Sequence, residues 1–145
     1  MYKHILIPTD GSEKSTRAIT QGVALAALLK ARVTAVVATP PNPPVVLEGL
    51  AAPVRNEELE QTNSTYAARS LAVAAEAALA AGVRCETIHL RHDQPWRAII
   101  ETAEQKDCDL IVMASHGRAG VAAVLLGSET NKVLTHSKIP VLVCR

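Results

Sequence analysis

The chain has 145 residues, of which 48% are hydrophobic and 20% are charged, and its formal net charge is +1. This composition is typical of one globular domain over residues 1–145 and excludes a disordered or fibrous chain. The small net charge and the 2% of aromatic residues argue against nucleic acid as a partner, because proteins that bind nucleic acid usually carry a basic surface or stacking rings.

No apolar run approaches the roughly 20 residues that span a bilayer, and the start, MYKHILIPTD, is too short and too interrupted for a signal peptide. No membrane association is therefore expected. The three cysteines, Cys85, Cys108 and Cys144, show no CxxC spacing. Free thiols in a reducing cytoplasm fit this pattern better than disulfides or a zinc site, so the sequence predicts a cytoplasmic protein.

Apolar runs alternate with helical patterns along the whole chain. The first run ends at the turn 8–12, where Ser12 is placed to cap the next helix through its hydroxyl group. Gly82 is the natural residue just beyond the second helix, and Pro95 is tolerated in the first turn of the third. The predicted strands are 3–8, 33–38, 83–90, 110–114 and 141–144, and the predicted helices are 13–30, 56–81, 94–105 and a short one from 127–128 to about 136.

This alternation predicts an α/β fold, an open Rossmann-like parallel sheet with helices on both faces, because the connections between parallel strands are right-handed crossovers. The runs 3–8 and 110–114 are almost wholly apolar, as expected for strands buried on both faces. Arg84 and Glu86 interrupt the third strand, which indicates a sheet edge. Residues 39–53 hold five prolines and no periodicity, so we expect a long loop there that serves a site or a partner.

Ligands of an open parallel sheet bind beyond the carboxyl ends of the strands, where the strand order reverses. The first and fourth strands end at 8–10 and 113–115, and glycine-containing turns follow both, so a cleft between these ends is the expected site. Further on, Gly127 and Ser128 open a helix whose free N–H groups and partial positive charge suit a phosphate. The alternative interpretation is that Ser128 only caps its own helix.

The segment Ser115-His116-Gly117, followed after nine residues by Gly127-Ser128, resembles the C-terminal signature of the universal stress protein family. That signature is glycine, two residues, glycine, nine residues, glycine, then serine or threonine. Residues 8–12 look like the family's N-terminal motif, and the order and lengths of the elements match over the whole chain. The resemblance implies a five-stranded sheet in the order 3-2-1-4-5 and usually a homodimer. Some members bind ATP, and others bind no nucleotide.

The resemblance also implies which residues bind the nucleotide. The positions that match the family's contacts to adenine and ribose are Thr9, Asp10 and Ala38, and those that match its contacts to phosphate are Gly117, Gly127, Ser128 and the neighbouring amides. The full set expected to bind ATP is Pro8, Thr9, Asp10, Ala38, Met113, Ala114, His116, Gly117, Arg118, Gly127, Ser128, Glu129 and Thr130.

Two residues weigh against nucleotide binding. Ala114 stands where the first glycine of the signature belongs, and its methyl group is expected to narrow the approach to ribose or phosphate. Glu129 puts a carboxylate into the first helical turn, where it stabilises the helix dipole but repels phosphate unless Mg²⁺ or Mn²⁺ lies between them. Arg118 is the base in the loop that would offset this charge.

No set of catalytic residues emerges from the sequence. Ser115 and His116 are neighbours, so their side chains are expected to point apart in an extended segment. Asp10 suits a turn or a cap, and a phosphorylated aspartate is rejected because residues 90–92 supply no acidic residue at the end of the third strand. The histidines near that end give only a weak hint of a metal. No metal site in the protein is therefore expected, and any hydrolysis of ATP is expected to be slow.

The fifth strand, residues 141–144, lies at an edge of the implied sheet and carries no guarding charge before Arg145. A bare apolar edge invites aggregation unless it is covered, which predicts a two-fold dimer through this strand. Two functions remain open. One is a stress-response protein that binds ATP or a related adenine nucleotide. The other is a dimeric signalling or scaffold protein that binds no nucleotide and acts through protein partners.

Overall fold

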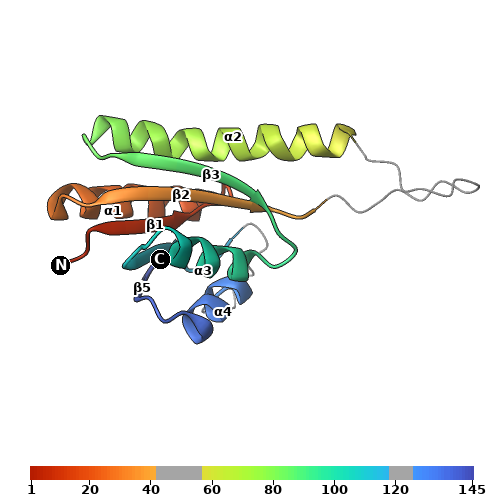
Figure 1. Ribbon diagram of the computed structural model, residues 1–145. Coiled ribbons are helices and arrows are strands. Elements are labelled where there is room, and N and C mark those ends of the chain that lie inside the picture. The colour runs from red at the N-terminus through yellow and green to blue at the C-terminus, as the bar shows by residue number, and fades with distance from the viewer. Residues whose placement is uncertain (42–56, 118–125) are drawn as a thin grey trace, which may run out of the picture.

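The computed structural model describes residues 1–41, 57–117 and 126–145. Over these residues, strands and helices alternate along the chain (Figure 1). The elements are β1 (His4–Pro8), α1 (Glu13–Leu29), β2 (Arg32–Thr39), α2 (Glu57–Ala80), β3 (Cys85–Arg91), α3 (Pro95–Gln105), β4 (Leu110–Ala114), α4 (Ser128–His136) and β5 (Val141–Cys144). Residues 42–53 of the predicted proline-rich loop lie outside the described residues.

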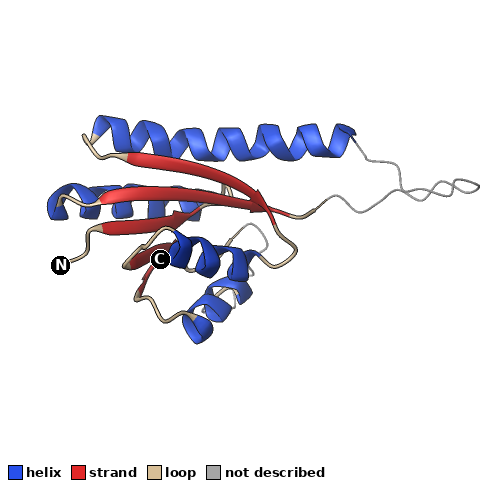
Figure 2. Cartoon of the chain, viewed as in Figure 1, coloured by secondary structure: helices blue, strands red, loops and turns tan. Residues whose placement is uncertain are grey.

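The strands form one parallel sheet in the order β3-β2-β1-β4-β5. Helices α1 and α2 lie on one face of this sheet, and α3 and α4 lie on the other (Figures 1 and 2). The predicted fold class and strand order are therefore confirmed. Because β4 pairs with β1 on the side away from β2, the strand order reverses between β1 and β4.

The central strands β1 and β4 are apolar apart from His4, because both of their faces are buried. Ile5 and Ile7 pack in the core cluster on the side of α1 and α2, whereas Leu6 between them packs with α3 and α4. The same two-residue period places Val112 and Ile111 of β4 on opposite faces. Each such side chain, removed from water, contributes about 1.5–3 kcal/mol, so the two central strands anchor both helical layers.

Hydrogen bonds explain where the strands begin and end differently from the prediction. β3 begins at Cys85 and not at residue 83, because the Val83 N–H donates to the Ala78 carbonyl at 2.8 Å and belongs to the end of α2. β2 continues to Thr39, whose carbonyl accepts from the His92 N–H at 2.9 Å. The sheet is thus longer at its β2–β3 end than the sequence pattern indicates.

The helix ends follow the predicted capping residues. The Ser12 side chain accepts a hydrogen bond from the Ser15 N–H at 3.2 Å and caps α1. Gly82, just beyond α2, has a φ of 68°, a left-handed conformation that glycine adopts without strain. Pro95 occupies the first turn of α3, but the residue before it, Gln94, makes no side-chain cap. The start of α3 therefore needs another partner.

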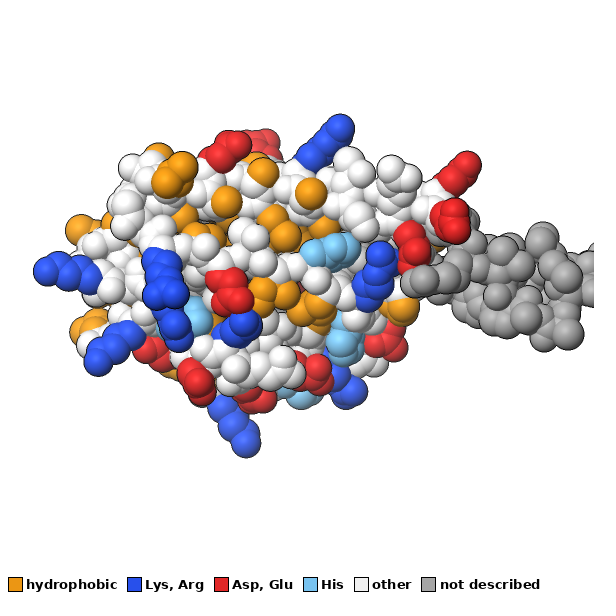
Figure 3. All heavy atoms as spheres, turned by 45° about the horizontal axis from the view of Figure 1, so that its top comes forward, with side chains coloured by type: hydrophobic (Ala, Val, Ile, Leu, Met, Phe, Trp, Pro, Cys, Tyr) orange, Lys and Arg blue, Asp and Glu red, His pale blue; other side chains and the backbone are white. Residues whose placement is uncertain are grey.

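The surface carries charges of both signs. On the face in Figure 3, basic and acidic side chains are interspersed, with hydrophobic side chains between them. Within the described ranges, no helix is both long and apolar enough to cross a membrane.

Candidate functional site

A cavity of about 320 Å³ lies at the carboxyl ends of β1 and β4, where the strand order reverses. Every residue that the sequence assigned to the site lines this cavity, except Arg118, which lies outside the described residues. The predicted residues that the structure brings together are Pro8, Thr9, Asp10, Ala38, Met113, Ala114, His116, Gly117, Gly127, Ser128, Glu129 and Thr130.

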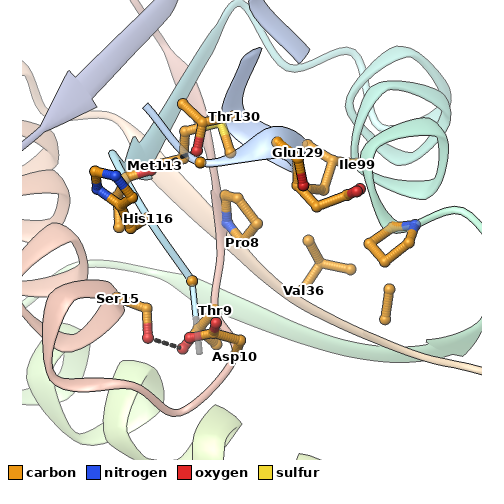
Figure 4. A pocket seen from close by; sticks show the side chains of 16 residues that line it. Pro8, Thr9, Asp10, Ser15, Val36, Ile99, Met113, His116, Glu129 and Thr130 are labelled. Carbon is orange, nitrogen blue, oxygen red and sulfur yellow. Dashed lines mark hydrogen bonds between the residues drawn. The ribbon is translucent and has the colours of Figure 1, made fainter. Parts of the chain in front are cut away.

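Four further residues line the cavity, and they come from three different elements. Val36 precedes Ala38 by two positions on β2, so the period of a strand was a usable signal for it. Pro95 and Ile99 lie one helical turn apart in α3, and Ser15 lies in the first turn of α1. No pattern in the local sequence predicts that the starts of α1 and α3 face the cavity. Figure 4 shows Val36 and Ile99 on one side of the cavity and His116 and Met113 on the other.

The turn between β1 and α1 uses its polar side chains to hold its own shape. The hydroxyl groups of Thr9 and Ser15 lie 3.0 Å apart (Figure 4), and the Thr9 oxygen accepts from the Gly11 N–H at 3.2 Å. The Asp10 carboxylate accepts from the Ser12 N–H at 3.0 Å, as the turn interpretation of Asp10 predicted. Thr9 and Asp10 therefore support the turn while they also line the cavity.

The start of α4 is tied directly to the end of β4. The Gly127 N–H donates to the Ser115 carbonyl at 2.7 Å, and the buried Thr130 hydroxyl donates to the Ala114 carbonyl at 2.8 Å. A Cβ atom added to Gly127 would lie 3.2 Å from both the Cα of His116 and the Ser115 carbonyl oxygen. Glycine is thus required for this close approach of two backbone segments.

The amino end of α4 has unused donors at the cavity. Gly127 is the N-cap residue and provides no side-chain cap, and the first helical hydrogen bond runs from the Asn131 N–H to the Gly127 carbonyl at 3.0 Å. The earlier N–H groups of the helix have no carbonyl of α4 to bind. Ser128 is the first helical residue, and its exposed hydroxyl has no hydrogen-bond partner in the part of the chain that the structure describes. The interpretation of Ser128 as the cap of its own helix is therefore wrong.

The side chains of Ser115 and His116 do not point apart. The Ser115 Oγ and the His116 Nδ1 lie 3.1 Å apart and are both buried. The prediction assumed an extended segment, but β4 ends at Ala114 and the chain bends at Ser115. Of the two, only His116 lines the cavity, so this pair does not present a serine nucleophile to a ligand.

Glu129 connects α4 to α3. Its Oε2 accepts a hydrogen bond from the Trp96 N–H at 2.8 Å, and its Oε1 lies 3.4 Å from the Lys132 Nζ. The carboxylate therefore caps α3 from a different helix, in the place that Gln94 leaves without a side-chain cap. A negative charge at a helix amino end is favourable. Glu129 also lines the cavity, so one wall of the cavity carries a carboxylate at the start of α3.

The fold and the cavity together define a Rossmann-like α/β protein with a ligand cleft at the reversal of the strand order. Residues 1–145 match the model of the universal stress protein family. The chain belongs to this family, as its two motifs predicted.

Individual family members agree with this assignment. The chain is 34% identical over 145 residues to a universal stress protein of Thermus aquaticus, and the match covers 100% of both chains. The structure of protein MJ0577 of Methanocaldococcus jannaschii superposes with a TM-score of 0.81 at 27% identity, covering 99% of this chain and 95% of that one. A universal stress protein in complex with cAMP superposes with a TM-score of 0.71 at 26% identity, covering 99% and 97%.

Proposed function

We propose that the protein binds ATP or a related adenine nucleotide in the cavity between β1 and β4 and serves a stress response in the cytoplasm. One observation carries this proposal, namely the free amino end of α4 at the cavity. The Ser128 hydroxyl and the first N–H groups of the helix have no partner within the helix, and a helix amino end with free donors is suited to a phosphate.

The rest of the cavity is suited to the nucleoside. Its volume of about 320 Å³ is within the range of small-molecule sites. Val36, Ala38 and Ile99 offer apolar surface for a flat ring, and the polar turn at Thr9 and Asp10 adjoins them. The related protein whose structure contains cAMP supports an adenine nucleotide as the ligand class.

Ala114 lines the cavity, but little of its surface is exposed there. Ala114 is only 8% exposed and belongs to the core cluster that packs against α1 and α2. Its carbonyl is already engaged by the Thr130 hydroxyl. We infer that the methyl group leaves room for a nucleotide and that it lowers the affinity for the nucleotide without abolishing binding.

A divalent cation would accompany the nucleotide and would not occupy a site of the protein's own. Among the described residues, no group of three histidine, cysteine or acidic side chains is placed to hold a metal ion. Two carboxylates, Asp10 and Glu129, do line the cavity. Mg²⁺ or Mn²⁺ on the phosphates would lower their repulsion by these groups, since both cations favour oxygen ligands.

The proposal includes no catalytic residue. Ser115 does not reach the cavity, and the Thr9 and Asp10 side chains are engaged in the turn. Hydrolysis of bound ATP is therefore expected to be slow or absent.

Titration calorimetry with ATP, with and without Mg²⁺ or Mn²⁺, tests the proposal. We expect saturable binding by the native protein and a loss of affinity of a hundredfold or more in Gly127→Val, because two methyl groups would enter a gap where even a Cβ is tight. Ser128→Ala removes one donor and should weaken binding by roughly fivefold, with no change in melting temperature. Circular dichroism checks that both variants fold. An absence of binding by the native protein would leave the dimeric scaffold as the better function.

We also propose a homodimer formed through β5, with Val141–Cys144 as its contact. Leu142 is 44% exposed on this strand, whereas the opposite edge strand, β3, carries the ion pair of Glu86 with Lys106 at 2.6 Å. Charge guards an edge against pairing, and an apolar edge invites it. Light scattering should give the mass of a dimer at micromolar concentration, and Leu142→Lys should shift it to a monomer. A native protein that is monomeric under these conditions would contradict the proposal.

A further inference from the structure

The Glu129 carboxylate has acceptor capacity that the described residues do not fill. A carboxylate offers about four lone-pair positions. The Trp96 N–H takes one of them at 2.8 Å, and the Lys132 Nζ lies at a long 3.4 Å from the other oxygen. No other polar contact to this carboxylate occurs within residues 1–41, 57–117 and 126–145. Because Glu129 lines the cavity, the remaining positions are available to a ligand.

The environment of the carboxylate limits what that ligand group can be. The Trp96 N–H fixes Oε2 at the start of α3, where Pro95 and Ile99 supply the apolar lining. Figure 4 shows Glu129 beside Ile99 and away from His116. A carboxylate accepts hydrogen bonds and cannot donate them, and like charges in a partly desolvated cavity repel strongly. A phosphate oxygen is therefore disfavoured next to this carboxylate, and a neutral N–H or O–H donor is favoured.

A nucleotide carries such donors on its nucleoside half. The ribose presents hydroxyl groups, and adenine presents its 6-amino group. With the phosphate at the free amino end of α4, the nucleoside extends along the cavity toward the apolar lining from α3 and β2. Glu129 directly follows Ser128 in α4, but its side chain reaches to the Trp96 N–H at the start of α3. Its carboxylate therefore lies beside the lining from Pro95 and Ile99, toward which the nucleoside extends.

We propose that Glu129 is a specificity-determining residue that accepts a hydrogen bond from a donor group of the bound nucleoside. This inference rests on the proposed function, since it needs a nucleotide in the cavity. It gives Glu129 a role opposite to simple repulsion of the ligand. The carboxylate orients the nucleotide and selects a nucleoside that brings a donor, either a ribose hydroxyl or the 6-amino group, to the start of α3.

Binding of three monophosphates to the native protein and to Glu129→Gln tests this role. The ligands are AMP, 2′-deoxy-AMP, which lacks a ribose hydroxyl, and inosine monophosphate, in which oxygen replaces the 6-amino group. A hydrogen bond to a charged acceptor is worth about tenfold in affinity or more. We expect the native protein to prefer AMP over at least one analogue by about tenfold, and Glu129→Gln to reduce that preference to within about twofold.

The choice of variant separates specificity from stability. Glutamine retains an oxygen that can accept from the Trp96 N–H, so α3 stays capped and the melting temperature should change little. Glu104→Gln, at an exposed position near the end of α3, removes the same charge away from the cavity and should leave the preference unchanged. A preference for AMP over 2′-deoxy-AMP would identify the ribose hydroxyl as the donor to Glu129. A preference for AMP over inosine monophosphate would identify the 6-amino group.

The remaining outcomes are decisive. If the native protein binds all three ligands alike, or if Glu129→Gln keeps the native preference, the inference fails while the proposed function stands. If the native protein binds none of the three, nor ATP, the proposed function fails and the inference fails with it.

Discussion

The two ends of the sheet use polar groups in opposite ways. At the amino ends of the strands, the Asp109 carboxylate accepts from the Lys3 and His4 N–H groups at 2.8 and 3.0 Å. The His4 Nε2 lies 2.8 Å from the buried Thr34 hydroxyl. At the carboxyl ends, the start of α4 and the Ser128 hydroxyl keep donors that no residue of the helix binds. The polar groups at the amino end bond neighbouring strands to one another, whereas those at the start of α4 are open to a ligand.

This difference follows from the parallel arrangement of the strands. All carboxyl ends of the strands lie at the same end of the sheet. There the reversal of the strand order separates the turns that follow β1 and β4 and leaves a cavity. At the amino ends of the strands the chain enters the sheet from the helices, and the starts of neighbouring strands can form hydrogen bonds with one another. A polar residue at the amino end is therefore expected to act on stability, and one at the carboxyl end on binding.

Of the changes at the amino end, Asp109→Ala is expected to reduce the stability of the protein more than a change at His4. It removes two charge-assisted hydrogen bonds at the start of β1 and should lower the free energy of unfolding by about 2 kcal/mol. Urea denaturation measures this loss. The affinity for ATP, measured below the unfolding transition, should stay within about twofold of the native value.

Asp109→Asn is the matched control for this prediction. The asparagine amide retains one acceptor oxygen. The free energy of unfolding of this variant should therefore fall by about half as much as that of the alanine variant. A drop in ATP affinity with no loss of stability would contradict the division of roles between the two ends of the sheet.

Most of the fold was predictable because the strong signals are local. The mostly apolar runs of β1 and β4 reflect burial on both faces. Ser12, Gly82 and Pro95 mark helix ends through their own chemistry. The strand boundaries were less predictable. Val83 continues an apolar pattern, yet its N–H bonds to the end of α2, a choice that only the packed structure decides.

The candidate site was predictable where it lies on the motifs. The residues missed, Pro95 and Ile99 above all, reach the cavity because α3 packs beside it, and no local pattern encodes that placement. The same holds for Glu129. Its position in the first turn of α4 was evident, but its bond to the Trp96 N–H joins two helices and could not be inferred from spacing. A contact between residues far apart in the sequence thus determines where the Glu129 carboxylate lies in the cavity.

The smallest expected effect concerns His4, also at the amino end. Burial lowers the pKa of His4 below its usual value of 6.5, and the nearby Arg32 lowers it further, against the opposing influence of the Lys106 backbone, Asp109 and Glu86. The Nδ1 of His4 is buried and makes no hydrogen bond among the described residues. The folded protein therefore favours the neutral ring.

The sign of the pH dependence follows from this lowered pKa. Above pH 6.5 both the folded and the unfolded protein carry a neutral His4, and its contribution to stability is complete. As the pH falls below 6.5, the unfolded chain takes up the proton first, so stability decreases until the pH passes the lower pKa of the folded state. Urea denaturation should show the native protein losing more stability between pH 7.5 and pH 5.5 than His4→Gln. His89, whose pKa burial also lowers, is present in both proteins and cancels in the difference. Equal losses in the two proteins would show that His4 is not the group responsible.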